Sequence, residues 1–158
     1  MKNLHKLFSL LFLLLISCDK DDTPAKVIDL KAEITYEMVS QTSATNGTVK
    51  IIGHVKNVGN SAYISSADDQ IANLVLKSPG ASDVLFEDLA FSTVPKDGEL
   101  TFSKNISWDT SNEFPPNFQL NIVYNPDILI DSSNDNDDLN DANNTFLLNG
   151  TTINTIFN

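Results

Sequence analysis

Apolar and polar residues alternate along most of the chain. From Leu30 to Met38 every second residue is apolar, and the residues between them are charged or polar. Successive side chains of a β-strand point to opposite faces of a sheet, so this period predicts a strand with one buried and one solvated face. Similar alternation predicts strands over 49–56, 71–77, 100–108 and 118–124, and a final apolar run over 145–157.

Three positions leave alternatives open. Ser66-Ala67-Asp68-Asp69, before the strand at 71–77, has the residues of a helix cap as well as those of a turn. Lys104 interrupts the apolar row of its strand, which indicates either a bulge or an edge position. The final run changes phase across Asn149-Gly150, which indicates either a bulge or a short hairpin.

The elements together predict an all-β fold. About seven short, one-sided strands are separated by Gly, Pro, Asn and Asp, and no long segment has a helical period. This pattern is typical of a single immunoglobulin-like antiparallel β-sandwich, in which two half-apolar sheets bury their inner faces together.

The first residues form a separate segment. A basic head with Lys2 and Lys6 precedes an apolar run from Leu7 to Ile16, and the small Ser17 comes directly before Cys18. A spanning helix needs about 20 apolar residues, so the run is too short to cross a membrane and reads as a secretory signal peptide over residues 1–17. Residues 18–26 are then a charged tether, and residues 27–158 are the folded domain.

The residues around Cys18 point to a lipid anchor. Leu15-Ile16-Ser17-Cys18 resembles the lipobox, whose cysteine becomes lipidated and is then made N-terminal by cleavage; the alternative is an ordinary signal peptide with a chance cysteine. Cys18 is the only cysteine, so no disulfide partner explains it. Cys18-Asp19-Lys20-Asp21-Asp22 also resembles the export signal of Bacteroidetes surface lipoproteins, although a solvated linker has the same composition. These resemblances imply that Cys18 holds the chain in the outer membrane, facing outward.

The charge of the mature chain excludes one class of partner. Removal of residues 1–17 leaves 8 lysines and 21 acidic residues, a formal charge of 8 − 21 = −13, and the chain has no arginine. A surface this acidic repels phosphate backbones, so we expect no binding to nucleic acid.

Four motifs follow the predicted strands in a recognisable order. The second predicted strand ends in Val55–Gly59 (Val-Lys-Asn-Val-Gly); Asp97-Gly98-Glu99 opens the strand that ends at Trp108; Asn125-Pro126-Asp127 follows the penultimate strand; and Asp138–Asn144 (Asp-Leu-Asn-Asp-Ala-Asn-Asn) leads into the last run. This series resembles the cell-adhesion-related domain found in bacteria (CARDB). The resemblance implies an immunoglobulin-like fold and an adhesive or structural role with an unknown protein or glycan as partner. The chain departs from the pattern over Asp131–Asp137 and Ser78–Thr93, which are longer than the corresponding loops.

The loop before the last run is the best metal candidate. It carries five aspartates among other oxygen-bearing residues, and carboxylate and amide oxygens are the ligands that calcium prefers. An EF-hand loop counted from Asp131 would need Gly and Glu where the chain has Asn136 and Ala142, so a calcium site would be irregular. The alternative is a solvated turn with Asx capping, in which Asn143-Asn144 fixes the strand connection. The candidate ligands are Asp131, Asp135, Asp137, Asp138 and Asp141; no other cofactor is expected.

The remaining side chains do not predict catalysis. His54 is the only histidine after processing, and it shares the outward face of its strand with Lys50 and Lys56. The acidic pairs Asp68-Asp69 and Glu87-Asp88 read as solvated loop residues rather than as groups facing each other across a cleft. No Gly-x-Ser-x-Gly or phosphate-loop motif occurs, so we expect no enzyme. Two aromatic side chains could stack on sugars: we expect Trp108 in the core and Tyr63, near a turn, at the surface.

Overall fold

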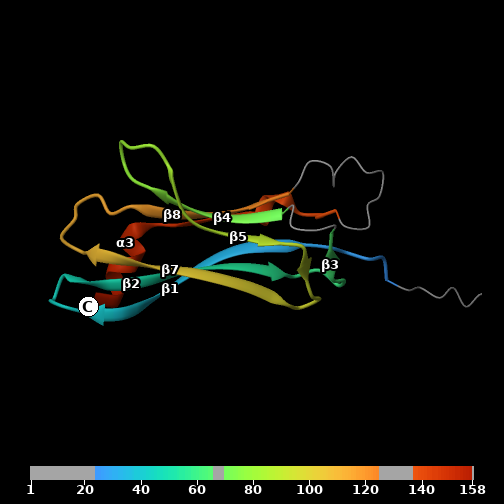
Figure 1. The fold of residues 1–158 in the computed structure, drawn as a ribbon, viewed down its shortest axis with the longest axis horizontal. Helices are drawn as coiled ribbons and strands as arrows, with labels where there is room; N and C mark the ends of the chain where they lie inside the picture. Colours follow the sequence, from blue (N-terminus) through green and yellow to red (C-terminus); the bar gives the residue numbers. More distant parts are fainter. Residues whose placement is uncertain (1–23, 66–69, 125–136, 158) are drawn as a thin grey trace, which may run out of the picture.

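The computed structural model describes residues 24–65, 70–124 and 137–157 (Figure 1). Almost all of the regular structure in these ranges is β-strand. The strands are β1 (Leu30–Gln41), β2 (Asn46–Asn57), β3 (Tyr63–Ile64), β4 (Gln70–Lys77), β5 (Val84–Phe91), β6 (Thr93–Val94), β7 (Glu99–Asp109), β8 (Asn117–Val123) and β9 (Thr145–Leu148). The short helices are η2 (Asp141–Asn143), α3 (Gly150–Ile153) and η3 (Asn154–Phe157). No helix in the described ranges is long and apolar enough to cross a membrane.

The strands form two layers, as the alternation predicts. One sheet has the order β1-β2-β7 and the other the order β5-β4-β8-β9, and every neighbouring pair of strands is antiparallel. The prediction of an all-β, antiparallel sandwich is confirmed. The described ranges hold nine strands rather than about seven, because β3 and β6 are two-residue strands that form a small pair of their own.

The connections between the layers are those of an immunoglobulin-like sandwich. The chain crosses from the first sheet to the second between β2 and β4, and it returns between β5 and β7. β3 lies in the first crossing and β6 in the second, and Tyr63 of β3 pairs with Val94 of β6. The two crossings are therefore tied together at one end of the sandwich.

β5 is a strand that the alternation does not reveal. A bulge interrupts its pairing with β4: Leu74 lies opposite Glu87, but the next residue, Val75, lies opposite Leu85. Phe86 is the extra residue, and its ring packs on Phe118 in the core, with 5.2 Å between the centroids. The bulge changes the phase of the strand midway, so no period of two runs through it.

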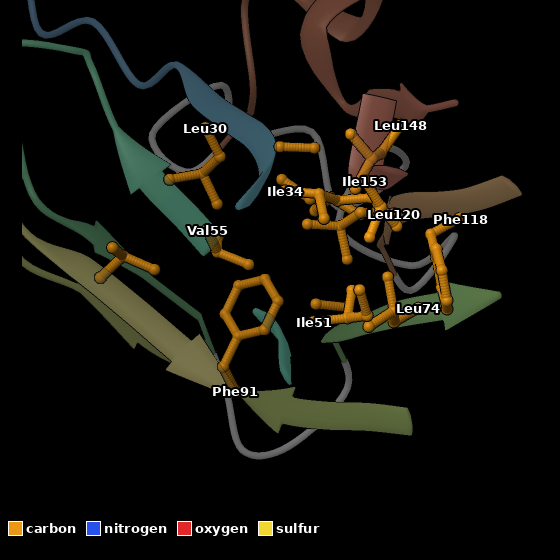
Figure 2. Close-up of a cluster of buried hydrophobic side chains, with 14 of the residues drawn as sticks. Leu30, Ile34, Ile51, Val55, Leu74, Phe91, Phe118, Leu120, Leu148 and Ile153 are labelled. Atoms are coloured by element: carbon orange, nitrogen blue, oxygen red, sulfur yellow. The ribbon is translucent and has the colours of Figure 1, made fainter. Parts of the chain in front are cut away.

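The core lies between the inner faces of the sheets (Figure 2). Each fully buried aliphatic or aromatic side chain contributes about 1.5–3 kcal/mol relative to an exposed one. Many of the inward residues belong to the predicted strands, among them Leu30, Ile34, Val49, Ile51, Val55, Leu74, Phe118, Leu120 and Leu148.

The last residues correct one prediction. After β9 the chain forms neither a bulge nor a hairpin at Asn149-Gly150 but turns into α3 and η3. Gly150 permits the turn because a Cβ there would lie 2.2 Å from the carbonyl oxygen of Pro116. Ile153 and Phe157, four residues apart and so on one helical face, are both buried in the core. The phase shift in the sequence therefore marks a change from strand to helix.

Lys104 occupies an edge strand, one of its two predicted alternatives. β7 pairs only with β2, and that pairing has no bulge. Lys104 belongs to the inward row of β7, but its ammonium group reaches β5, where it donates to the carbonyl oxygen of Phe86 at 2.6 Å and lies 3.5 Å from the carboxylate of Glu87. An inward-pointing charge on an edge strand opposes the addition of another chain's strand.

Candidate functional site

The start of the domain is fixed to the connection between β2 and β3. The Asn60 side chain accepts a hydrogen bond from the Val27 amide (2.8 Å) and donates one to the Ala25 carbonyl (2.9 Å). Gly59 permits this approach, because a Cβ there would lie 2.4 Å from the Val27 carbonyl oxygen. The predicted signal peptide, Cys18 and Asp19–Asp22 lie outside the described residues, which begin at Pro24.

Asn57 in the Val55–Gly59 motif has a structural role. Its buried side chain donates to the carbonyl oxygens of Ser61 (2.8 Å) and Val94 (3.1 Å), and it accepts from the Gly59 amide (3.0 Å). These bonds connect the end of β2 to β6. The motif thus shapes the end of the sandwich at which the tether leaves.

Asp138 is a structural residue of the acidic loop. Its carboxylate accepts hydrogen bonds from the Tyr124 hydroxyl (2.7 Å), the Leu30 amide (3.4 Å) and the Asn140 amide (3.0 Å). Burial, and then the bond to Asp138, raise the pKa of Tyr124 far above its ordinary range. Tyr124 therefore stays protonated and donates, and Asp138 joins the loop to β8 and to the start of β1.

The Asn-Asn pair leaves oxygen atoms without donors. Asn143 donates to the Asp29 carboxylate at 2.8 Å, and Asn144 donates to the Asp141 carboxylate at 3.5 Å. Their amide oxygens, and Oδ1 of Asp137, are buried and accept no hydrogen bond among the residues that the structure describes. A buried acceptor needs a donor, a cation or a water molecule as its partner.

The predicted calcium ligands are only partly described. Asp131 and Asp135 lie outside the described residues, whereas Asp137, Asp138 and Asp141 lie within them. Within residues 24–65, 70–124 and 137–157, no three Asp, Glu, His or Cys side chains gather closely enough to hold a metal ion.

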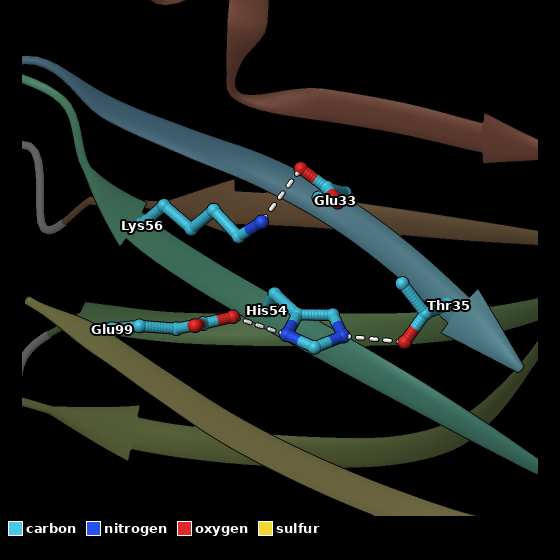
Figure 3. Close-up of polar contacts among 5 residues, drawn as sticks. All are labelled: Glu33, Thr35, His54, Lys56 and Glu99. Carbon is cyan, nitrogen blue, oxygen red and sulfur yellow. Dashed lines mark hydrogen bonds and ion pairs between the residues drawn. The ribbon is translucent and has the colours of Figure 1, made fainter.

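His54 lies on the outer face of the β1-β2-β7 sheet, as its phase predicts, but its side chain is only 14% exposed (Figure 3). Nε2 lies 2.6 Å from the Thr35 hydroxyl of β1, and Nδ1 contacts the Glu99 carboxylate of β7. Glu-His-Thr contacts in this order have the connectivity of a carboxylate, base and hydroxyl nucleophile. The Thr35 and His54 positions, however, are inside the regular ladder between β1 and β2, so their surroundings are a flat sheet face.

Two ion pairs join β1 and β2 on this face. Lys56 pairs with Glu33 across β1 and β2, with 2.9 Å between Nζ and Oε2, and Lys50 pairs with Glu37 at 2.6 Å. The bond from Lys56 lowers the pKa of Glu33, and the same bond raises the pKa of Lys56. The face is charged but internally neutralised.

A shallow pocket of about 320 Å³ lies at the end of the sandwich opposite the tether. Hydrogen bonds from the side chain and backbone of Ser111 hold the pKa of Asp109 below its ordinary value, so this carboxylate is charged at neutral pH. Sequence reasoning did not find the pocket, because its two parts are some 60 residues apart along the chain and only the pairing of β2 with β7 joins them. The lining residues are Thr42, Asn46, Gly47, Thr48, Ser107, Trp108 and Asp109.

The two aromatic predictions have different outcomes. Trp108 is in the core, as predicted, and its indole N–H donates to Asn154 at 2.8 Å. The expectation of an exposed Tyr63 is wrong: the side chain is fully buried and its ring lies about 6 Å from those of Phe91 and Tyr124. The turn near Tyr63 is a crossing that covers the core, so the outward position belongs to Ile64.

Of the two acidic pairs, the structure describes Glu87-Asp88. On β5, Asp88 is exposed, and Glu87 lies near Lys104. Asp68-Asp69 falls outside the described residues, and so does the choice between a helix cap and a turn at Ser66–Asp69.

Comparisons with known proteins add little to this description. No family model matches the chain, and no curated protein matches it. Among solved structures, the chain is similar to one described as "X-ray structure of Northeast Structural Genomics Consortium target SoR45", with 10% sequence identity and a TM-score of 0.33. The similarity covers 77% of this chain and 81% of that chain. The fold described above comes from the strands and sheets of this chain itself.

Proposed function

We propose that this chain is a non-catalytic lipoprotein of the bacterial cell envelope, held in the outer membrane by lipid on Cys18 and facing outward. Its sandwich, which resembles CARDB domains in four sequence motifs, acts as an adhesion or structural module that binds a protein or a glycan.

The polar pocket opposite the tether carries the binding part of this proposal. Its lining offers hydroxyl, amide and carboxylate groups from Thr48, Ser107, Asn46 and Asp109. Such groups donate and accept hydrogen bonds, as the hydroxyl groups of a sugar and the backbone of a peptide require. The pocket lies at the end that an anchor on Cys18 would leave farthest from the lipid.

The anchor is tested by metabolic labelling with an alkyne fatty acid in a bacterial host that acylates lipoproteins. We expect label on the wild-type chain and none on Cys18→Ala. Protease treatment of intact cells then tests the leaflet: an outward-facing chain is cleaved without lysis. A chain without label contradicts the anchor, and a labelled chain that survives the protease contradicts outward display.

Binding is tested with the mature domain on a glycan array and against immobilised envelope proteins. Ser107→Lys fills the pocket with a long charged side chain, whereas Ser103→Lys makes the same change on the same face of β7, outside the pocket. We expect Ser107→Lys to lose the bound partner and Ser103→Lys to keep it. Equal binding by both variants would assign the partner to another surface.

The buried oxygens of Asp137, Asn143 and Asn144, which accept no hydrogen bond among the described residues, favour a second candidate function, a calcium-dependent module. Calcium would bind Oδ1 of Asp137, Asn143 and Asn144, because it prefers carboxylate and amide oxygens as ligands.

Melting of the mature domain in calcium and then in chelator tests this candidate. A ligand that binds only the folded state raises its stability by about 2.7 kcal/mol at one hundred times its dissociation constant. We therefore expect a higher midpoint in calcium and a loss of that difference in Asn144→Ala. Identical midpoints for the wild type in millimolar calcium and in chelator would remove the candidate.

A further inference from the structure

Exposed aliphatic side chains surround the point at which the tether enters the domain. Val58 is 52% exposed and Leu139 is 65% exposed. The Val58 amide donates to the Asp29 carbonyl (2.8 Å) and the Leu139 amide to the Ile28 carbonyl (3.0 Å), so the two residues flank the first residues of the domain. Ile64, 63% exposed, belongs to β3, which lies at the same end of the sandwich (Figure 1).

The length of the tether limits how far this end can lie from an anchor on Cys18. Cys18 and Pro24 are six residues apart in the sequence, and an extended chain spans at most about 3.3–3.6 Å per residue, which gives roughly 20 Å. Asn60 and Gly59 fix the next residues to the domain, so the tether gains no further length there.

We infer that the end of the sandwich carrying Val58, Ile64 and Leu139 lies against the lipid surface when the chain is anchored. The inference rests on the proposed lipid at Cys18. A tether of this length keeps this end of the sandwich at a high effective concentration next to the bilayer, so even a weak contact is populated. Apolar side chains that are removed from water at the interface supply that contact.

The contact would set the orientation of the whole domain. The long axis of the sandwich would stand away from the membrane, and the opposite end would face outward. That end contains the polar pocket and the connection after β7, where Phe114 is 64% exposed.

Single cysteines carrying an environment-sensitive fluorophore test the inference in the acylated full chain. Acylation consumes Cys18, so the new thiol is the only one to be labelled. The sites are Ile64→Cys and Leu139→Cys, with Phe114→Cys as a matched control because its exposure is nearly equal and it lies at the other end. The protein is reconstituted in phosphatidylcholine vesicles that contain doxyl-labelled lipid; neutral headgroups avoid repulsion of the acidic chain.

We expect the labels at positions 64 and 139 to lose fluorescence to the doxyl lipid and the label at 114 to keep it. Equal quenching at both ends of a chain that floats with the vesicles would overturn the inference alone. A chain that carries no acyl group and does not float would overturn the anchor, and the inference with it. Shielding of labels 64 and 139 without vesicles, rising with protein concentration, would assign this end to a second copy of the chain and also overturn it.

Discussion

The Tyr124 hydroxyl donates a hydrogen bond to the partly buried Asp138 carboxylate at 2.7 Å. A hydrogen bond to a charged acceptor is stronger than one between neutral groups, and the partly buried position reduces competition from water. The pair connects the end of β8 to the loop before β9. An acidic residue that looks like a metal ligand in the sequence is thereby occupied in holding its own loop.

We expect Tyr124→Phe to lower the free energy of unfolding by about 1–3 kcal/mol, because the substitution removes the one side-chain donor that the described residues offer to the Asp138 carboxylate. Urea denaturation of the mature domain measures the change. Tyr36→Phe is the control: its hydroxyl donates to the Thr152 carbonyl at an exposed site, 3.1 Å away, so its loss should have a smaller effect. Equal losses in the two variants would contradict a special role for the buried pair.

At the scale of elements, the β1-β2-β7 sheet carries its charge as cross-strand pairs. The pKa of Glu33 is lowered mainly because Lys56 donates a hydrogen bond to it, so the pair stabilises the folded chain at neutral pH. This stabilisation is lost as the pH falls from the ordinary value of 4.5 through the lowered pKa. On the alkaline side it is lost only as the pH rises through the raised pKa of Lys56, above the ordinary 10.5.

Glu33→Gln should therefore reduce stability at pH 7 by roughly 0.2–1 kcal/mol, and the difference from wild type should disappear in strong acid, where both chains lack the charge. Urea midpoints at a series of pH values between 7 and 2 measure this dependence. Asp88→Asn, at an exposed position of β5, is the control. A difference that stays constant down to the lowest pH would rule out the ion pair as its source.

Elements with an unbroken period could be predicted from sequence, and the others could not. β1, β2 and β8 have buried inner rows that match their apolar positions. β5 was missed because its bulge shifts the phase at Phe86, and β3 and β6 because two residues contain no period. α3 and η3 together offer only two buried apolar side chains with helical spacing, Ile153 and Phe157, too few to separate helix from strand.

The candidate site was less predictable for a different reason. The partners of His54 and the walls of the pocket come from strands that are distant in the sequence, and their contacts depend on strand order and register. The Asp138 motif was found from its residue types, but its role required the position of Tyr124. Composition thus identified polar residues of interest, and only the topology showed what they contact.

At the scale of the whole molecule, the C-terminal helices complete the core. Ile153 is fully buried between the sheets, and replacement by Ala would remove apolar contacts and leave a cavity. We expect Ile153→Ala to lower the free energy of unfolding by about 2–5 kcal/mol.

Thermal or urea unfolding of Ile153→Ala measures this loss. Leu147→Ala removes a half-exposed aliphatic side chain from nearby β9 and should cost less. If Ile153→Ala is no more destabilising than Leu147→Ala, the helical segment is not part of the cooperative core.

The position of Ile153 and Phe157 also sets the order of events during synthesis. Both follow β9, yet both belong to the core cluster that the earliest strands form: Ile153 lies near Ile34 of β1 (Figure 2), and the Phe157 ring lies against Gly47 of β2. A nascent chain that still lacks these residues has an incomplete hydrophobic core, even if both sheets have formed. Ribosomes add residues far more slowly than helices and hairpins form. The core of this domain is consequently completed only after residues 153 to 157 have been synthesised.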